Sequence, residues 1–244
     1  EHKDTEQLAY NLGEFKPGDE IEITLKIHGT SQRTAYVPVL VDGAYETKSL
    51  MKGFLLKHMP KKMLEKYAEK WGTPIYDYNY ISGTRRTVMD TFEGGFYGSN
   101  EFREQHHEFF KGKLWKGETV YYEVVGFTHT GAPIMAEVAN SKVSDKEFAK
   151  QYGKTTVFSY GCTPNGKKTM YGCDGFGAFE IDLDHPQSDI YVYRMTMTNE
   201  DGNVVEYTPD FMRYRCEQMG VKCVPVMWKG TIPQNPASAD DPTI

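Results

Sequence analysis

The segment Thr119–Phe127, with the sequence TVYYEVVGF, constrains the fold more than any other part of this chain. β-Branched and aromatic residues make up most of it, and such residues favour β-strands. Because side chains alternate between the two faces of a strand, Glu123 is predicted to point away from the face of Val124. A strand of this kind needs neighbours for its backbone hydrogen bonds, so the rest of the sequence must supply a sheet.

Other segments supply these neighbours. From Glu20 to Ile27, apolar residues alternate with polar ones, which predicts a half-buried strand. A tight turn and a second strand, Arg33–Val41, follow, and Pro38 favours an edge position for that second strand. Further strands are predicted at Tyr76–Met89 (interrupted at Ser82-Gly83), at Ile190–Thr198 and at Cys223–Met227, with a hairpin turn at Glu200–Asn203.

Helical patterns are fewer. An apolar stripe predicts helix within Leu50–Trp71, and Pro60 is expected to interrupt it. Capping signals predict three more helices, at Asn100–Phe110 with Asn100 as the N-cap, at Ser144–Tyr152, and from Thr208-Pro209-Asp210 to Gly220. The order of elements predicts one α+β domain with mostly antiparallel sheets and flanking helices.

Composition narrows the class of protein. With 28 Lys and Arg against 34 Asp and Glu, the net charge is −6, which gives no support to a general nucleic-acid coat but allows a local basic groove. No apolar run approaches the roughly 18 residues that a membrane helix needs. The four cysteines have no short paired spacing of the kind a zinc site uses. We therefore expect a cytoplasmic protein that does not enter a membrane.

The stretch Thr24–Ser31, TLKIHGTS, carries the clearest chemical signal. Lys26 lies near the end of the first predicted strand, three residues before Gly29, and a glycine allows the chain to turn tightly. A lysine amine becomes a nucleophile when it is desolvated or lies near other cations. A K-x-x-G pattern alone more often marks a solvated surface lysine before a turn. The neighbouring residues are therefore needed to tell a nucleophile from a surface lysine.

That longer string, Lys26-Ile-His-Gly-Thr30, resembles the nucleotidyltransferase motif of ATP-dependent RNA ligases, in the branch of the RNA-editing ligases and their phage relatives. Further matches follow in the family's order at Ser82–Arg86, Tyr121–Gly126 and Asp189–Met195, and then at the Val-Pro segment Gly220–Pro225 after a helix. The resemblance implies the ATP-grasp-like nucleotidyltransferase fold of the ligase superfamily.

The resemblance also implies a reaction. Lys26 attacks the α-phosphate of ATP and becomes covalently adenylylated. The AMP then passes to an RNA 5′-phosphate, and a 3′-hydroxyl attacks to seal the strand. The implied cofactors are ATP and Mg²⁺ (or Mn²⁺), and the implied partner is RNA with 5′-phosphate and 3′-hydroxyl ends. The protein would act in the cytoplasm or, if a phage encodes it, in the cytoplasm of the host.

The site residues that the resemblance implies come from several motifs. Beside Lys26, the nucleotide-binding set is Thr24, Leu25, Ile27, His28, Gly29, Arg85, Arg86, Glu123 and Tyr193. Tyr193 is expected to stack on adenine, with Tyr191 on the same strand face, and Glu123 is the candidate metal ligand. We expect Lys26 and Glu123 to lie within about 15 Å of each other, as residues lining one ligand pocket do.

Two later motifs of the family have no match after Pro225: an acidic-Gly-apolar segment and a Lys-x-Lys strand that binds phosphates. Asp174–Phe179 resembles the acidic segment in composition, but it precedes the Asp189–Met195 strand and is therefore out of order. We expect residues 1–231 to form an incomplete adenylation domain and residues 232–244 a loop or linker, with the missing motifs in a longer natural chain.

Two alternatives stay open on the sequence. One is a DNA ligase or GTP-using capping enzyme of the same fold, but His28 stands where those enzymes commonly carry the aspartate of K-x-D-G, which favours an RNA ligase. The other is an inactive RNA- or nucleotide-binding remnant that forms no covalent intermediate. The sequence does not say whether the chain binds other proteins.

Two further patterns have ordinary structural explanations. The doublet His106-His107 suggests a metal site, but adjacent helical residues face different ways, which favours a solvated or locally bonded pair. The lysines at 57, 61, 62 and 66 suggest a patch facing RNA, although a charge run is usually a solvated helix face.

Overall fold

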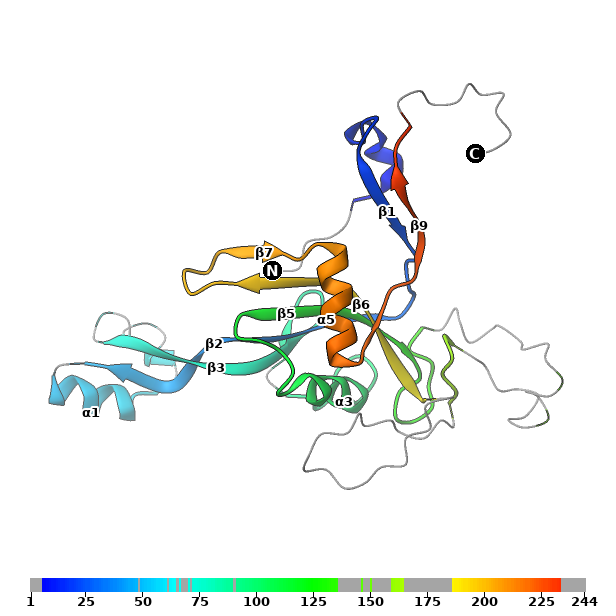
Figure 1. The fold of residues 1–244 in the computed structure, drawn as a ribbon. Helices are drawn as coiled ribbons and strands as arrows, with labels where there is room; N and C mark the ends of the chain where they lie inside the picture. Colours follow the sequence, from blue (N-terminus) through cyan, green and yellow to red (C-terminus); the bar gives the residue numbers. More distant parts are fainter. Residues whose placement is uncertain are drawn as a thin grey trace.

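A computed structural model describes residues 6–47, 49–60, 62–64, 72–89, 91–135, 159–164 and 186–233, together with residues 66, 70, 146 and 150. The strands form one seven-stranded and one two-stranded sheet, and a few helices flank them (Figure 1). The prediction of an α+β fold with mostly antiparallel sheets is confirmed. Of the predicted helix Ser144–Tyr152 only residues 146 and 150 are described, and the tail from residue 234 lies outside the described residues.

The larger sheet has the strand order β4-β3-β2-β5-β6-β7, and β8 pairs with β6 outside this path. Its pairings are antiparallel except for that of β6 with β8. The predicted TVYYEVVGF strand is β5, which lies between β2 and β6 and is buried along almost its whole length. The strands are β2 (Thr30–Glu46), β3 (Thr73–Gly83), β4 (Val88–Met89), β5 (Glu118–Gly126), β6 (Ser188–Thr198), β7 (Val204–Glu206) and β8 (Lys222–Cys223).

The smaller sheet pairs β1 (Glu20–Thr24) with β9 (Val226–Thr231), and Figure 1 shows this ribbon beside the larger sheet. The prediction of one strand that reaches Ile27 and turns back onto Arg33–Val41 is therefore wrong. The strand is shorter, and it pairs with β9 in the smaller sheet instead of with β2. β1 ends at Thr24, after a bulge, because Ile27 turns inward to pack on residues of the larger sheet. The burial of that one side chain separates β1 from β2.

Two prolines mark where strands change partners. Pro38 lies in the interior strand β2 rather than on an edge, but β5 pairs only with Thr30–Ala35, so β2 has one open side at Pro38. On that side the Tyr36 carbonyl accepts a hydrogen bond from Gly117 N–H. The backbone of Pro38 faces the same side as that of Tyr36, so the N–H that Pro38 lacks removes no hydrogen bond between strands. Pro225 similarly divides the predicted strand Cys223–Met227 between β8 and β9.

The helices follow their capping signals closely. In α5 (Pro209–Met219), the Thr208 hydroxyl accepts a hydrogen bond from Phe211 N–H, proline occupies the first turn, and Gly220 ends the helix with φ +70°. The other helices whose bounds the structure describes are η1 (Leu8–Tyr10), η2 (Leu12–Glu14), α1 (Leu50–His58) and α3 (Glu101–Phe110), and residues 62–64 are helical as well. Asn100 stands at the predicted N-cap position of α3, although its side chain makes no capping bond.

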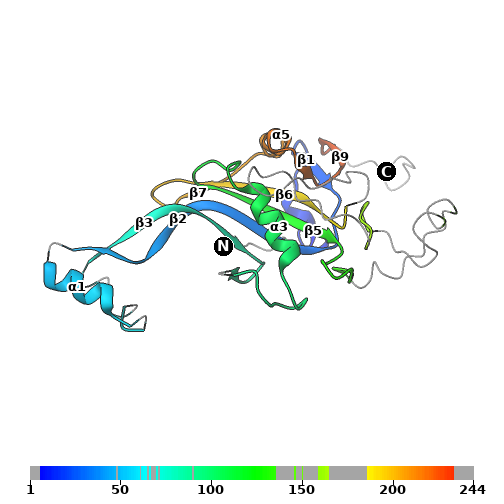
Figure 2. The same cartoon turned by 90° about the horizontal axis from the view of Figure 1, so that it is seen from below.

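Helix α1 ends before Pro60, as predicted, but its apolar stripe is mostly exposed. Only Leu56 is buried within α1, whereas Leu50 and Phe54 are largely exposed. Figures 1 and 2 both place α1 at the far end of β2 and β3. None of the helices among the described residues is long and apolar enough to cross a membrane.

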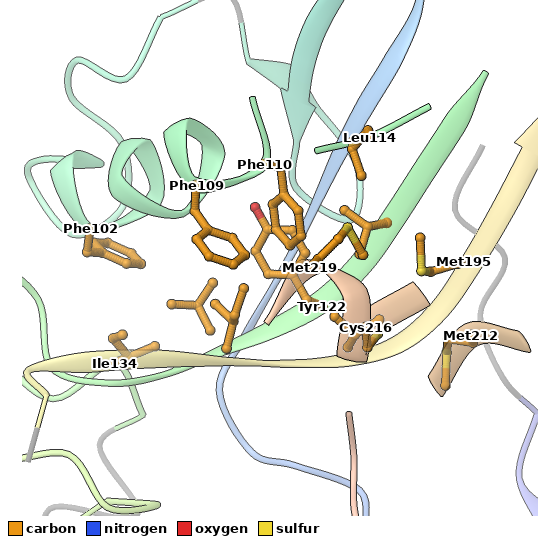
Figure 3. Close-up of a cluster of buried hydrophobic side chains, with 14 residues drawn as sticks. Phe102, Phe109, Phe110, Leu114, Tyr122, Ile134, Met195, Met212, Cys216 and Met219 are labelled. Atoms are coloured by element: carbon orange, nitrogen blue, oxygen red, sulfur yellow. The ribbon is translucent and has the colours of Figure 1, made fainter. Parts of the chain in front are cut away.

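The main core gathers side chains from α3, α5 and one face of the larger sheet (Figure 3). Val120, Tyr122 and Val124 alternate along β5 and belong to this cluster, while α3 lies against the sheet (Figure 2). The opposite face of β5 carries Tyr121, Glu123 and Val125, and Val125 belongs to a second, smaller cluster. The main core therefore fixes the strands, and the second face is left for the candidate site.

Candidate functional site

The loop of residues 25–29, which joins β1 to β2, is held at both ends and in the middle. Leu25 N–H donates to the Pro225 carbonyl at 2.9 Å, and Ile27 is buried with Val125, Val224 and others in the second cluster. Lys26 and His28, on either side of Ile27, are exposed. Burial of the central isoleucine thus holds the loop while it leaves the lysine and the histidine accessible.

Gly29 makes the closest approach between this loop and β5. Its N–H donates to Glu123 Oε1 at 3.0 Å, and a Cβ atom at position 29 would lie 2.2 Å from the Val124 carbonyl oxygen. No real Cβ sits at that distance, so only glycine fits here. The glycine of the K-x-x-G pattern is required by this contact with the strand of Glu123.

Glu123 lies on the sheet face predicted for it, and its environment is unusual. Burial raises the pKa of Glu123 to about 7, although the Gly29 N–H and the charges of Arg103 and Lys26 oppose the shift. Three residues of chain span at most about 11 Å, so the 3.0 Å bond from Gly29 brings the Lys26 backbone within the expected limit of about 15 Å from Glu123. Lys26 therefore lies near Glu123, and its charge acts on that carboxyl group.

A β-bulge in β6 shapes the aromatic side of the site. Tyr121 pairs with Arg194 but Tyr122 pairs with Val192, so Tyr193 is the extra residue on β6. The Tyr193 hydroxyl lies 2.9 Å from Ser31 Oγ, and its ring packs against the same cluster as Tyr191. Both tyrosines therefore share the face of Glu123, as the resemblance implies.

The same bulge brings a cation to that face. The Arg194 guanidinium lies 5.0 Å from the ring centroid of Tyr121, whose side chain shares the face of Glu123. Simple alternation along β6 would place Arg194 on the face opposite Tyr193.

Arg85 and Arg86 lie in the turn between β3 and β4, and both side chains are exposed. The turn is tied to β2 because Arg33 donates to the Thr84 carbonyl at 2.5 Å. The structure therefore places the two arginines at the end of the larger sheet from which β2 leaves Gly29. Thr24 and Leu25, the first two implied residues, are exposed where β1 ends.

Three residues outside the predicted set support the site. Arg103 of α3 is buried and donates to Thr30 Oγ1 at 2.6 Å and to the Ser31 carbonyl at 3.1 Å, which holds the start of β2. Lys222 is ion-paired to Asp189 at 2.5 Å, beside Tyr191. Their sequence neighbourhoods carry no signal for these contacts, since each joins segments far apart in the chain.

The third supporting residue is Tyr160, whose hydroxyl accepts the His28 N–H at 3.0 Å. Tyr160 has a φ of +50°, and Gly161 follows with +86°, between the mutually hydrogen-bonded Ser159 and Cys162. Such a conformation is uncommon for a tyrosine and costs roughly 1 kcal/mol or more. The Tyr-Gly pair is a turn signal that the sequence does contain.

The histidine doublet on α3 is buried and bonds two different strands, so the expectation of a solvated pair is wrong. His106 Nε2 lies 3.1 Å from Ser188 Oγ, and His107 Nδ1 lies 2.8 Å from Ser82 Oγ. Burial lowers the pKa of each histidine to about 4. The two rings bond different strands, and no cluster of three or more metal-ligating side chains occurs in the described part of the chain.

The lysine run near α1 has exposed side chains at Lys57, Lys62 and Lys66, whereas Lys61 falls outside the described residues. These exposed side chains agree with a solvated helix face, and the alternative of a patch facing RNA stays a prediction. The structure also has a hollow of about 500 Å³ lined by Thr91, Phe92, Glu93, Ser99, Glu101 and Glu104. Three glutamates in its wall would repel phosphates, so this hollow is a poor nucleotide site.

The resemblance implies ATP with Mg²⁺, and the site offers one carboxylate, that of Glu123, which would suit such an ion. Mg²⁺ commonly keeps several waters and uses one or two carboxylates together with substrate phosphates. Glu123 offers one such carboxylate, and burial disfavours its charged form, so a nearby cation would stabilise that form. Glu123 would be the residue to hold such an ion.

Comparison with known proteins adds no further evidence on the family: neither a family model nor a curated protein matches this chain. The order of the motifs and the geometry that brings them together are the features that indicate a function.

Proposed function

We propose that this chain is the adenylylating domain of an ATP-dependent RNA ligase, with Lys26 as the nucleophile. The observation that carries the proposal is the contact of Gly29 with Glu123, because it joins the first and third motifs through a position where only glycine fits. Tyr193, from a further motif, lies on the same face. Motifs about 95 and 165 residues apart in sequence thus gather around one exposed lysine.

Each residue has a role in the proposed reaction. The neutral Lys26 amine attacks the α-phosphorus of ATP, the bond to the bridging oxygen breaks, and pyrophosphate leaves with that electron pair. The Tyr193 ring offers a flat face to adenine. Mg²⁺, when bound with ATP, supplies countercharge for the phosphates. The AMP then passes to an RNA 5′-phosphate, and a 3′-hydroxyl displaces it to form the phosphodiester.

The alternatives differ in a measurable way. A capping-type enzyme of the same fold would transfer GMP from GTP, and an inactive remnant would bind nucleotide without a covalent bond. The exposed His28 in place of an aspartate favours the ligase proposal over the capping enzyme.

Intact-mass measurement after incubation with Mg²⁺ and either ATP or GTP separates these cases. The proposal predicts a gain of one AMP with ATP and no gain with GTP. A gain of GMP would indicate the capping-type reaction. Binding of ATP by calorimetry without any gain in mass would indicate the remnant.

A further inference from the structure

Lys222 presents a fixed cation beside the candidate site. In the parallel pairing of β8 with β6, Lys222 lies opposite Tyr191, and its ammonium group is 5.6 Å from that ring centroid. The ammonium nitrogen is 2.5 Å from Asp189 Oδ2. The Asp189 side chain is 3% exposed, whereas that of Lys222 is 57% exposed, so a buried carboxylate anchors an accessible amine.

The segment that carries Lys222 also touches the Lys26 loop. Val224 packs with Ile27 in the second cluster, and the Pro225 carbonyl accepts the Leu25 N–H at 2.9 Å. Residues 222 and 224 share one side of their segment, while Cys223, between them, packs on the main core. Lys222 and Lys26 are therefore each close in sequence to these two contacts, that of Val224 with Ile27 and that of Pro225 with Leu25, and lie on the same side of the sheet.

An ammonium group has three N–H donors, and Asp189 occupies one of them. Among the described residues the Lys222 side chain is 57% exposed, so its other N–H groups can reach a ligand on that side. Adenylyl transfer sends negative charge to the departing pyrophosphate, and a preorganised cation at that position lowers the barrier. The Lys-x-Lys strand that binds phosphates in the ligase family has no match in this sequence, which leaves this role open.

We propose that Lys222 binds the β- and γ-phosphates of the nucleotide whose α-phosphate Lys26 attacks, with Asp189 as the residue that positions it. This inference rests on the proposed function for the identity of the nucleotide. It adds Lys222 to the cations Arg85 and Arg86, which the resemblance already implies for the nucleotide.

Lys229 is the matched control. Its side chain is 53% exposed, similar to that of Lys222, and it also pairs with an aspartate, Asp210, at 3.0 Å. It lies on β9, however, and its partner belongs to the exposed first turn of α5 rather than to the site.

Calorimetry on the 244-residue chain should measure the affinities of ATP, AMP and inorganic tripolyphosphate for the wild type, Lys222→Met and Lys229→Met. Lys222→Met should weaken ATP and tripolyphosphate about tenfold or more, the effect of losing one charged hydrogen bond, and change AMP less than about twofold. Lys229→Met should leave all three near wild type. Unchanged ATP binding, or an equal loss for AMP, would overturn the assignment, provided that thermal melts show both variants folded.

Two further readouts separate this inference from the proposed function. If tripolyphosphate binding depends on Lys222 but Lys26 never becomes adenylylated, the phosphate site stands and the ligase proposal fails. If Lys26 is adenylylated while Lys222→Met binds ATP normally, the ligase proposal stands and this inference fails. A loss of binding confined to 5′-phosphorylated RNA, measured against the same RNA with a 5′-hydroxyl, would assign Lys222 to the RNA end and overturn the inference.

Discussion

At the residue scale, Glu123 and Gly29 form the contact on which the site depends. Glu123 is buried enough to hold its pKa at about 7, and its carboxylate accepts the Gly29 N–H. The alternation in TVYYEVVGF is sufficient to predict the face of Glu123. The reason for Gly29 could not be read from the sequence, because it depends on the Val124 carbonyl oxygen some 95 residues away.

Replacement of Glu123 by glutamine should change how stability depends on pH. The pKa of Glu123 rises from 4.5 to about 7 on folding. The folded state therefore holds a proton that the unfolded state has released, and the free energy of unfolding falls as pH rises between these values. Glu123→Gln should be more stable than wild type by about 2 kcal/mol at pH 8, with little difference at pH 4. Urea unfolding at both pH values measures this, and an equal difference at both would contradict it.

Replacement of Gly29 by alanine should break the contact sterically. Its Cβ would lie 2.2 Å from a backbone oxygen that cannot move aside easily. We expect a loss of about 2 kcal/mol or more in stability and at least a tenfold slower gain of AMP, since the Lys26 loop must shift. Gly13→Ala is the control, because a Cβ at Gly13 would meet nothing within 4 Å. Similar stability and labelling for the two variants would count against the account.

At the element scale, local signals were reliable and long-range ones were not. Thr208, Pro209 and Gly220 define the ends of α5 correctly, because a helix cap depends only on neighbouring residues. The end of β1 at Thr24 depends on the burial of Ile27 against another sheet, which no alternation pattern encodes. The bulge at Tyr193 in β6 could not be predicted either, since it is a property of pairing with β5.

Helix α3 should make the protein sensitive to mild acid. Burial lowers the pKa of His106 to about 4, so the unfolded state binds a proton that the folded state refuses between pH 6.5 and pH 4. The free energy of unfolding of the wild type therefore falls as the pH is lowered from 6.5 to 4. Over the same range, His106→Gln should lose about 2 to 3 kcal/mol less of this free energy than the wild type.

Urea unfolding at pH 6.5 and pH 4 tests this, with His58→Gln on the exposed face of α1 as the control. Parallel losses for wild type and His106→Gln would show that this buried histidine does not govern the acid response.

At the scale of the whole molecule, the site forms where the two sheets meet. The Lys26 loop follows β1 and is bonded through Leu25 to Pro225, which directly precedes β9. Strands β5, β6 and β8 supply Glu123, the tyrosines and Lys222 (Figure 1). The order of the motifs was readable from the sequence. The pairing of β1 with β9 was not, because it joins residues about 200 positions apart.

The central claim is that Lys26 carries the nucleotide. Arginine at position 26 keeps the positive charge but stays protonated, so it cannot attack phosphorus. Wild type and Lys26→Arg should be incubated with ATP and Mg²⁺, digested, and mapped by mass spectrometry, with urea unfolding as a check that both fold alike. We predict one AMP on the peptide that contains Lys26 in wild type and none in Lys26→Arg. An AMP on another lysine, or labelling that survives in Lys26→Arg, would contradict the account.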